Sequence, residues 1–223
     1  MAYNNSYRRL VSQSVYEDMK QAVPTCTALI NLCNLVGGFS CDSARDYCSQ
    51  ALIFPIELAG WNVYDVRIKC QKPPLCYDFS KIGAFLNRAD VREKLGVPTT
   101  VRRWEECSNS VNRRFHKDWI HSFDQEIPDL LHDKIPVLIY NGDTDFICNW
   151  MGEKRWVLAL QWNKTVEFQQ ARDVPWNNNA GLLRSAGPFS FLQIFNAGHM
   201  VPMDQPKIAL DMLNQFLKSG SLQ

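Results

Sequence analysis

The sequence predicts an α/β protein, with a mostly helical, cysteine-rich first half and a second half of alternating helices and strands. Three observations predict this fold class. Seven of the eight cysteines lie within the first 107 residues. Two nearly continuous apolar runs lie in the second half, and helical patterns alternate with them. A chain of 223 residues with this composition can bury a core of one or two domains.

The first half is predicted to form helices joined by short turns. Apolar residues recur at helical spacing in three stretches, residues 7–36, 43–59 and 80–95. The Gly37-Gly38 pair predicts the first turn. Aromatic and β-branched residues over 62–76 predict a short strand and a loop bounded by cysteines. We therefore expect a helical, cross-linked domain over residues 1–122.

The second half is predicted to contribute to a mainly parallel sheet. Residues 135–140 and 189–195 are apolar runs typical of strands buried on both faces. Helical patterns cover residues 123–132, 150–161 and 207–217. A further strand is expected at 165–170 and a loop over 171–188. Residues 123–223 are therefore expected to form an α/β core.

The charge balance gives no reason to expect nucleic acid or membrane as a partner. Lysine and arginine number 24 and aspartate and glutamate 23, so the net charge is +1. No stretch approaches 18 uninterrupted apolar residues. The first six residues are polar where a secretory signal would be apolar.

The cysteines are predicted to form disulfides. The spacings from Cys26 to Cys48 are seven, eight and seven residues, without any Cys-x-x-Cys pair. None of the four histidines is near this cluster in the sequence, so we expect no metal site. Disulfides point to the secretory pathway, and Asn4 and Asn163 begin glycosylation acceptor patterns. A secretory protein without a signal leads us to expect that its beginning is missing.

Candidate catalytic groups follow the two apolar runs. Asp143 and Asp145 come after the first and His199 after the second, so both sets would project toward one crevice at the strand ends. An aspartate that orients a histidine can activate a serine nucleophile. The simpler interpretation is that the aspartates shape a turn and the histidine is structural. No Gly-x-Ser-x-Gly elbow occurs, so a serine that precedes the acid and the histidine would lie upstream of Met1.

Two longer motifs favour the catalytic interpretation of the aspartates and the histidine. Residues 142–150, Gly-Asp-Thr-Asp-Phe-Ile-Cys-Asn-Trp, resemble the aspartate motif of carboxypeptidase Y-like serine carboxypeptidases, and residues 198–206, Gly-His-Met-Val-Pro-Met-Asp-Gln-Pro, resemble their histidine motif. Residues 62–67 and 75–77 extend the resemblance. It implies the C-terminal part of an α/β-hydrolase fold with a helical insertion, the N-terminal half of the sheet being absent. Asp145 would be the triad acid and His199 the general base.

The resemblance also implies roles for the cysteines and two aromatic residues. The implied disulfides are Cys26–Cys48, Cys33–Cys41 and Cys70–Cys76. Cys107 would be orphaned, because its family partner lies in the N-terminal half. The implied substrate-binding residues are Cys148 and Met200 at the pocket for the leaving residue, and Tyr64 and Tyr77.

The implied activity is removal of C-terminal residues from peptides, without a cofactor. This chain would be a fragment or second chain that needs an N-terminal, serine-bearing half, and we expect it to be inactive alone. The family further implies a vacuolar, lysosomal or extracellular location. Two alternatives stay open: a truncated, non-catalytic product that binds a peptide or partner, and a related acyltransferase.

Overall fold

A computed structural model describes residues 1–3, 5 and 7–222, so the acceptor pattern at Asn4 lies outside the described residues. The chain forms two compact units. The first comprises residues 1–23, 48–69 and 122–223, and the second comprises residues 24–47 and 70–121. This division differs from the expected boundary at residue 122, because residues 1–23 and 48–69 of the helical half belong to the first unit.

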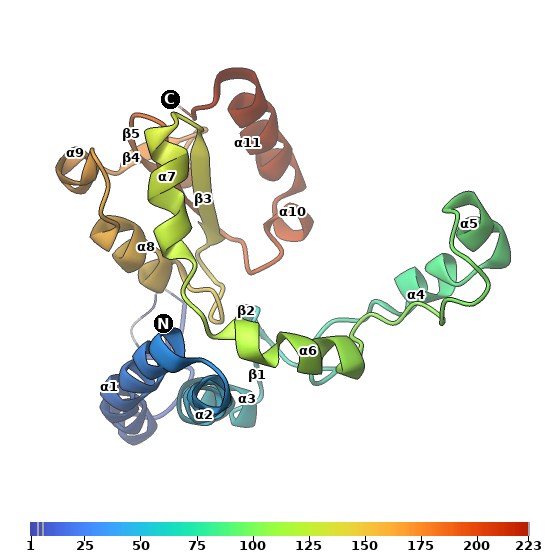
Figure 1. The fold of residues 1–223 in the computed structure, drawn as a ribbon. Coiled ribbons are helices and arrows are strands. Elements are labelled where there is room, and N and C mark those ends of the chain that lie inside the picture. Colours follow the sequence, from blue (N-terminus) through green and yellow to red (C-terminus); the bar gives the residue numbers. More distant parts are fainter. Residues whose placement is uncertain (4, 6, 223) are drawn as a thin grey trace. The chain divides into compact units, whose positions relative to one another are not determined.

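Helices and short strands alternate along the chain (Figure 1). The α-helices are α1 (Gln13–Val36), α2 (Phe39–Cys48), α3 (Phe54–Leu58), α4 (Ser80–Leu86), α5 (Ala89–Lys94), α6 (Asn109–Trp119), α7 (Ile127–His132), α8 (Trp150–Ala159), α9 (Thr165–Gln170), α10 (Val201–Asp204) and α11 (Pro206–Ser219). The strands are β1 (Trp61–Asn62), β2 (Asp65–Lys69), β3 (Val137–Gly142), β4 (Val174–Trp176), β5 (Gly181–Ala186) and β6 (Phe189–Ile194).

The first unit is built on a four-stranded sheet in the order β3-β6-β5-β4. β3 and β6 are parallel and in register from Val137 opposite Phe189 to Gly142 opposite Ile194. The pairs β5–β6 and β4–β5 are antiparallel. Every residue of β6 is buried, whereas β3 at the edge is only partly covered. Because the two strands are parallel, the loops that follow β3 and β6 leave the sheet at the same end of the strands.

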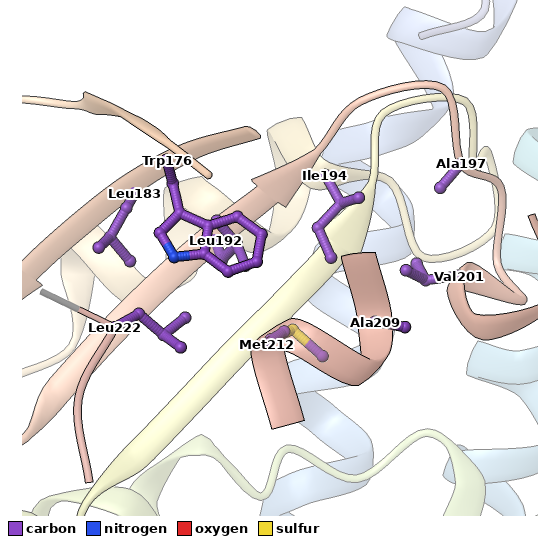
Figure 2. Packing of buried hydrophobic residues seen from close by; sticks show 9 residues of the cluster. All are labelled: Trp176, Leu183, Leu192, Ile194, Ala197, Val201, Ala209, Met212 and Leu222. Carbon is purple, nitrogen blue, oxygen red and sulfur yellow. The ribbon is translucent and has the colours of Figure 1, made fainter. Parts of the chain in front are cut away.

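Helices cover both faces of this sheet, which confirms the predicted α/β architecture. On one face α11 packs on the strands through a cluster that Figure 2 shows, including Leu192, Ile194 and Met212. On the other face α7, α8 and α9 pack against Phe189 and Phe191 of β6. Burial on both faces explains why β6 is mostly apolar and does not alternate, with Ser190 and Gln193 buried as well.

A third apolar cluster joins residues from the beginning and the middle of the helical half to the loop after β3. Leu10 and Met19 pack with Ile56, Val63 and Val66, and Phe146 from the loop after β3 belongs to the same cluster. Sequence periodicity gives no information on such pairings between distant segments. This cluster is the physical reason that the units do not divide at residue 122.

Two expected elements of the second half differ in the structure. Residues 165–170 form helix α9 and not a strand, since Thr165 bonds to the chain around Leu160 and Trp162, and Phe168 is buried against the sheet. Residues 171–188 contain β4 and β5 and are not a continuous loop. Three consecutive asparagines, 177–179, take positive φ angles and turn the chain between these strands.

The second unit is helical and has its own small core. Cys33, Cys41 and Ala44 are fully buried, with Leu29, Ile30 and Ile120 packed around them. Disulfides join Cys33 to Cys41 and Cys70 to Cys76, the pairings that the resemblance implies. Cys26 and Cys48 are each disulfide-bonded as well. Among the helices described, none combines the length and the apolar character needed to cross a membrane.

Candidate active site

Asp145 and His199 meet at the ends of the two parallel strands. Asp145 lies in the loop after β3, His199 lies in the loop after β6, and Nδ1 of His199 is 2.9 Å from Oδ2 of Asp145. The pair is separated by 54 residues in the sequence and is brought together by the in-register pairing of β3 with β6. Asp143 does not take this position.

The Asp145 carboxylate is buried and fixed on both oxygens. Its side chain is 2% exposed. Oδ1 accepts backbone N–H bonds from Ile147 at 3.1 Å and Cys148 at 3.3 Å, while Oδ2 faces His199. A carboxylate held in this way can fix the orientation and tautomer of an imidazole.

His199 is held on its backbone and open on its side chain. Its backbone N–H donates to the carbonyl of Tyr64 at 2.8 Å, and the two rings are tilted with centroids 5.4 Å apart. The imidazole is 40% exposed. Hydrogen bonds to Asp145 and to Cys148 raise the pKa of His199 from 6.5 to about 10. In this structure the imidazole therefore retains its proton at neutral pH.

Two glycines allow the loops around the pair to approach closely. A Cβ at Gly198 would lie 2.4 Å from the carbonyl oxygen of Tyr64, and one at Gly142 would lie 2.2 Å from that of Ala197. Any side chain would force backbone atoms apart at both positions. The glycine before His199 and the glycine that ends β3 are therefore required by the geometry of the site.

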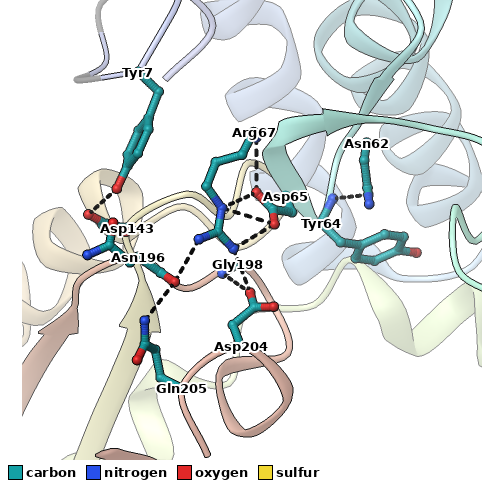
Figure 3. Close-up of polar contacts among 10 residues, drawn as sticks. All are labelled: Tyr7, Asn62, Tyr64, Asp65, Arg67, Asp143, Asn196, Gly198, Asp204 and Gln205. Atoms are coloured by element: carbon teal, nitrogen blue, oxygen red, sulfur yellow. Dashed lines mark hydrogen bonds and ion pairs between the residues drawn. The ribbon is translucent and has the colours of Figure 1, made fainter.

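An ion-pair network holds the histidine loop to the β1–β2 hairpin (Figure 3). Arg67 binds the buried Asp65 with Nη2–Oδ2 at 2.7 Å and also bonds Asp204 at 3.0 Å. Its Nη1 donates to the carbonyl of Asn196 at 2.8 Å. Asp204 in turn accepts the backbone N–H of Gly198 at 2.6 Å. The loop that carries the histidine is thus clamped on both sides of that residue.

This network was not predicted from the sequence, although Asp65 and Arg67 lie in residues 62–67 and Asp204 lies in the histidine motif. Asp65 and Arg67 occupy a short strand among Val63 and Val66, which are buried. Two opposite charges among such apolar residues could have indicated this ion pair, because buried charges are normally paired. Asp204, the partner from the histidine motif, could not be connected to them without coordinates.

Asp143 binds the N-terminal segment. The Tyr7 hydroxyl donates to its Oδ2 at 3.0 Å, as Figure 3 shows. Burial raises the pKa of Asp143 above its ordinary value. Burial and the neighbouring Asp143 raise the pKa of Tyr7 to about 12. Tyr7 therefore stays protonated and anchors residues near the N-terminus beside the aspartate loop.

A cleft of about 400 Å³ opens beside the pair. Its lining includes Asp145, Cys148, Glu153, His199 and Val201, together with the exposed edge of β3. Cys148 is a free, partly buried thiol. Its expected role in substrate binding stays a prediction.

The remaining predicted residues lie in different places. Met200 follows His199 and its carbonyl starts α10 by accepting the N–H of Met203 at 2.8 Å. Tyr77 lies in the second unit, with its ring 5.7 Å from that of Phe79. Cys107 is a free, exposed thiol of the same unit, and Asn163 is exposed in the first unit.

Two groups of side chains offer three metal-ligand atoms within 4.8 Å of one another in the described part of the chain. The first is Asp145, Cys148 and His199, where the carboxylate already accepts three hydrogen bonds. The second is Cys33, Cys41 and His121 in the second unit. None of the histidines is near the cysteine cluster in the sequence, but the end of α6 brings Nε2 of His121 to 3.6 Å from Sγ of Cys41 across 80 residues.

Comparison with known proteins identifies relatives of the whole chain. The family model described as serine carboxypeptidase matches residues 1–219. A serine carboxypeptidase-like protein of Pisum sativum is 44% identical over 216 residues, which cover 94% of this chain and 74% of that protein. Serine carboxypeptidase-like 47 of Arabidopsis thaliana is 40% identical, over 94% of this chain and 42% of its own length.

A fungal protein is also similar to nearly the whole chain, and a solved structure shares its fold. Carboxypeptidase Y homolog A of Botryotinia fuckeliana is 41% identical, over 96% of this chain and 40% of its own length. The structure of Kex1Δp, a prohormone-processing carboxypeptidase of Saccharomyces cerevisiae, superposes with a TM-score of 0.75 at 21% identity, over 94% of this chain and 49% of that one. The chain spans about two fifths of the length of the Arabidopsis and Botryotinia relatives.

Proposed function

The chain belongs to the serine carboxypeptidase family, and from this premise we propose that it supplies the acid and the base of a serine-type carboxypeptidase. The observation that carries the proposal is the Asp145–His199 pair. It combines a carboxylate that is 2% exposed with an imidazole that is 40% exposed. The Asp145 carboxylate is shielded from water and held in place, and the His199 imidazole is open enough to contact a reacting hydroxyl.

In the proposed reaction His199 moves the proton and Asp145 orients the ring. A serine oxygen attacks the last peptide carbonyl of a substrate while His199 takes the hydroxyl proton. The tetrahedral intermediate expels the C-terminal amino acid, whose amine receives that proton from His199. Water then attacks the acyl-enzyme while His199 takes a proton from it, and His199 returns this proton to the serine oxygen as the acyl group leaves. No cofactor is needed for these steps.

The imidazole must lose its proton before it can act as a base. In this structure it hydrogen-bonds to the Cys148 thiol in addition to Asp145, and both bonds favour the protonated ring. We propose that a serine hydroxyl replaces the thiol as the partner of the imidazole in the active enzyme. This exchange would lower the pKa of His199 and leave Cys148 to line the adjoining pocket.

The serine is proposed to come from a segment outside these 223 residues. The sequence contains no Gly-x-Ser-x-Gly elbow. β3 is an edge strand of the described sheet, and the cleft beside His199 runs along its exposed side. A serine-bearing segment that adds a parallel strand to β3 would place its own strand end at the same edge as Asp145 and His199. The chain alone is accordingly proposed to be inactive.

Substrate contacts from this chain are proposed for four residues. Cys148 lines the cleft, Tyr64 lies beside the imidazole, and Met200 follows it in the chain. Tyr77 is proposed by family resemblance. These side chains would contact a peptide near its C-terminus.

A location in the secretory pathway is proposed from the disulfides. Six cysteines are disulfide-bonded, which is typical of proteins in oxidising compartments. Asn163 starts an acceptor pattern at an exposed position, consistent with glycosylation. Vacuole, lysosome and extracellular space all fit these observations.

The direct test of inactivity is an assay of the purified chain with a blocked dipeptide, run beside labelling with a serine-directed fluorophosphonate. We expect neither turnover nor label, because triad members act as a unit. Turnover with a label on any serine of this chain would overturn the proposal that the nucleophile lies elsewhere. Transfer of the acyl group to an added alcohol in preference to water by the complete enzyme would favour an acyltransferase.

A further inference from the structure

We propose that Cys33, Cys41 and His121 form a Zn²⁺ site when the Cys33–Cys41 disulfide is reduced. This cluster lies in the second unit and is independent of the proposed catalytic pair. Cys33 is in the last turn of α1, Cys41 is in the first turn of α2, and His121 follows the end of α6. Three elements of one unit therefore contribute one ligand each.

The nitrogen-to-sulfur distances already suit tetrahedral zinc. Nε2 of His121 is 3.6 Å from Sγ of Cys41 and 3.8 Å from Sγ of Cys33. Zinc bonds of about 2.3 Å to sulfur and about 2.0–2.1 Å to nitrogen give a tetrahedral nitrogen–sulfur edge of about 3.6 Å. The two sulfurs, which are bonded to each other in the disulfide, must separate to about 3.8 Å across the metal.

A neighbouring amide can set the imidazole in the form that binds metal. Nδ1 of His121 is 3.2 Å from Oδ1 of Asn34, which follows Cys33 in the chain. When Nδ1 donates its proton to this oxygen, the lone pair of Nε2 points toward the two sulfurs. A carbonyl partner on the other ring nitrogen is the usual orienting contact of a histidine bound to zinc.

The surroundings favour a site that forms in the folded chain. Cys33 and Cys41 are both 0% exposed, and Ala44, Leu29 and Ile120 pack around them. Two buried thiols so close together would be held near the imidazole after reduction. Water would complete the fourth position, since three protein ligands are present in this group.

The redox step is a two-electron reduction by a dithiol. The dithiol becomes a cyclic disulfide, and its two hydrogens leave Cys33 and Cys41 as thiols. Zn²⁺ then displaces both thiol protons to solution and binds the two thiolates and the neutral His121. The disulfide joins only the α1–α2 hairpin, whereas the metal would also tie the end of α6 to it.

The experiment reduces the full chain with a water-soluble phosphine, which adds no thiol ligand, and follows alkylation of each cysteine by mass spectrometry with and without Zn²⁺. We expect Zn²⁺ to slow alkylation of Cys33 and Cys41 at least tenfold and to leave Cys70 and Cys76 unchanged. The His121→Gln variant should lose the protection. His116→Gln, at a partly exposed histidine of α6, is the matched control and should keep it.

Two further measurements complete the test. Asn34→Ala should weaken binding of Co²⁺, followed by its thiolate charge-transfer absorption, by roughly 10- to 100-fold, as is usual for a partner that orients a ligand. Circular dichroism records whether the reduced chain stays helical. Equal alkylation rates with and without Zn²⁺, protection that persists in His121→Gln, or loss of the fold on reduction would each overturn the proposal.

Discussion

Nδ1 of His199 lies 2.9 Å from Oδ2 of Asp145, although 54 residues separate them in the chain. The parallel pairing of β3 with β6 creates this contact, and the β1–β2 hairpin supports it through Tyr64 and Arg67. The pair thus depends on segments from three regions of the sequence. Its properties lead to the predictions that follow.

The Asp145→Asn variant should lower the pKa of His199, because the bond to the carboxylate is the largest cause of the increase to about 10. Two-dimensional NMR titration of the imidazole measures this, with His132, which is exposed, as the internal reference. A His199 pKa that is unchanged by the substitution would contradict the hydrogen bond between His199 and Asp145.

Stability should fall as the pH rises through the range set by His199. Its pKa is about 10 in the folded chain and 6.5 ordinarily, so the protonated form is favoured by folding. The contribution is complete below pH 6.5 and is lost progressively toward pH 10. Urea unfolding of the chain and of Asp145→Asn across this range should show that the difference between them shrinks with rising pH.

Arg67→Met should destabilise the first unit by about 3 kcal/mol, because it leaves the buried Asp65 without its ion-pair partner. Faster amide exchange at Gly198 and His199 should accompany this loss. Arg88→Met is the matched control, since Arg88 and Asp90 form an exposed pair. Equal effects of the two substitutions would show that the clamp does not hold the histidine loop.

Gly198→Ala should destabilise the chain by about 2 kcal/mol, because the new Cβ would lie 2.4 Å from the Tyr64 carbonyl oxygen. Gly83→Ala provides the control, since its Cβ meets only the Trp104 ring at 3.5 Å within helix α4. Thermal unfolding should show a lower midpoint for the first variant alone.

The chain should self-associate through the exposed side of β3. Edge strands with unpaired backbone groups are templates for further pairing, and Tyr140 on β3 is 40% exposed. Tyr140→Lys should reduce association measured by sedimentation velocity. A monomer that unfolds cooperatively without this substitution would contradict the prediction.

The sequence predicted the family, the α/β architecture and the apolar strands well, because long motifs and buried apolar runs are local signals. The strand ends predicted that Asp143 or Asp145 would lie near His199, and the family resemblance implied the choice of Asp145. Contacts between distant segments could not be predicted in this way. Arg67 with Asp204, and His121 with Cys41, are joined only by the tertiary fold.

The remaining differences between expected and observed secondary structure arise where the local sequence suits more than one conformation. Residues 165–170 contain Val166 and Phe168, which suit a strand, yet burial of Phe168 and the bonds of Thr165 favour a helix. The asparagines at 177–179 indicate a loop but form a turn between β4 and β5. These turn-forming residues did not predict that the short strands β4 and β5 lie on either side of them.

The central claim is that this chain provides the acid and the base for a serine that comes from elsewhere. The most direct measurement is complementation, in which the chain is combined with a serine-bearing N-terminal segment of a family relative and assayed with a blocked dipeptide. We predict activity and fluorophosphonate labelling of the added serine with the native chain, and loss of both with His199→Gln. Equal activity with His199→Gln would contradict the claim, because the proton transfer would then not pass through His199.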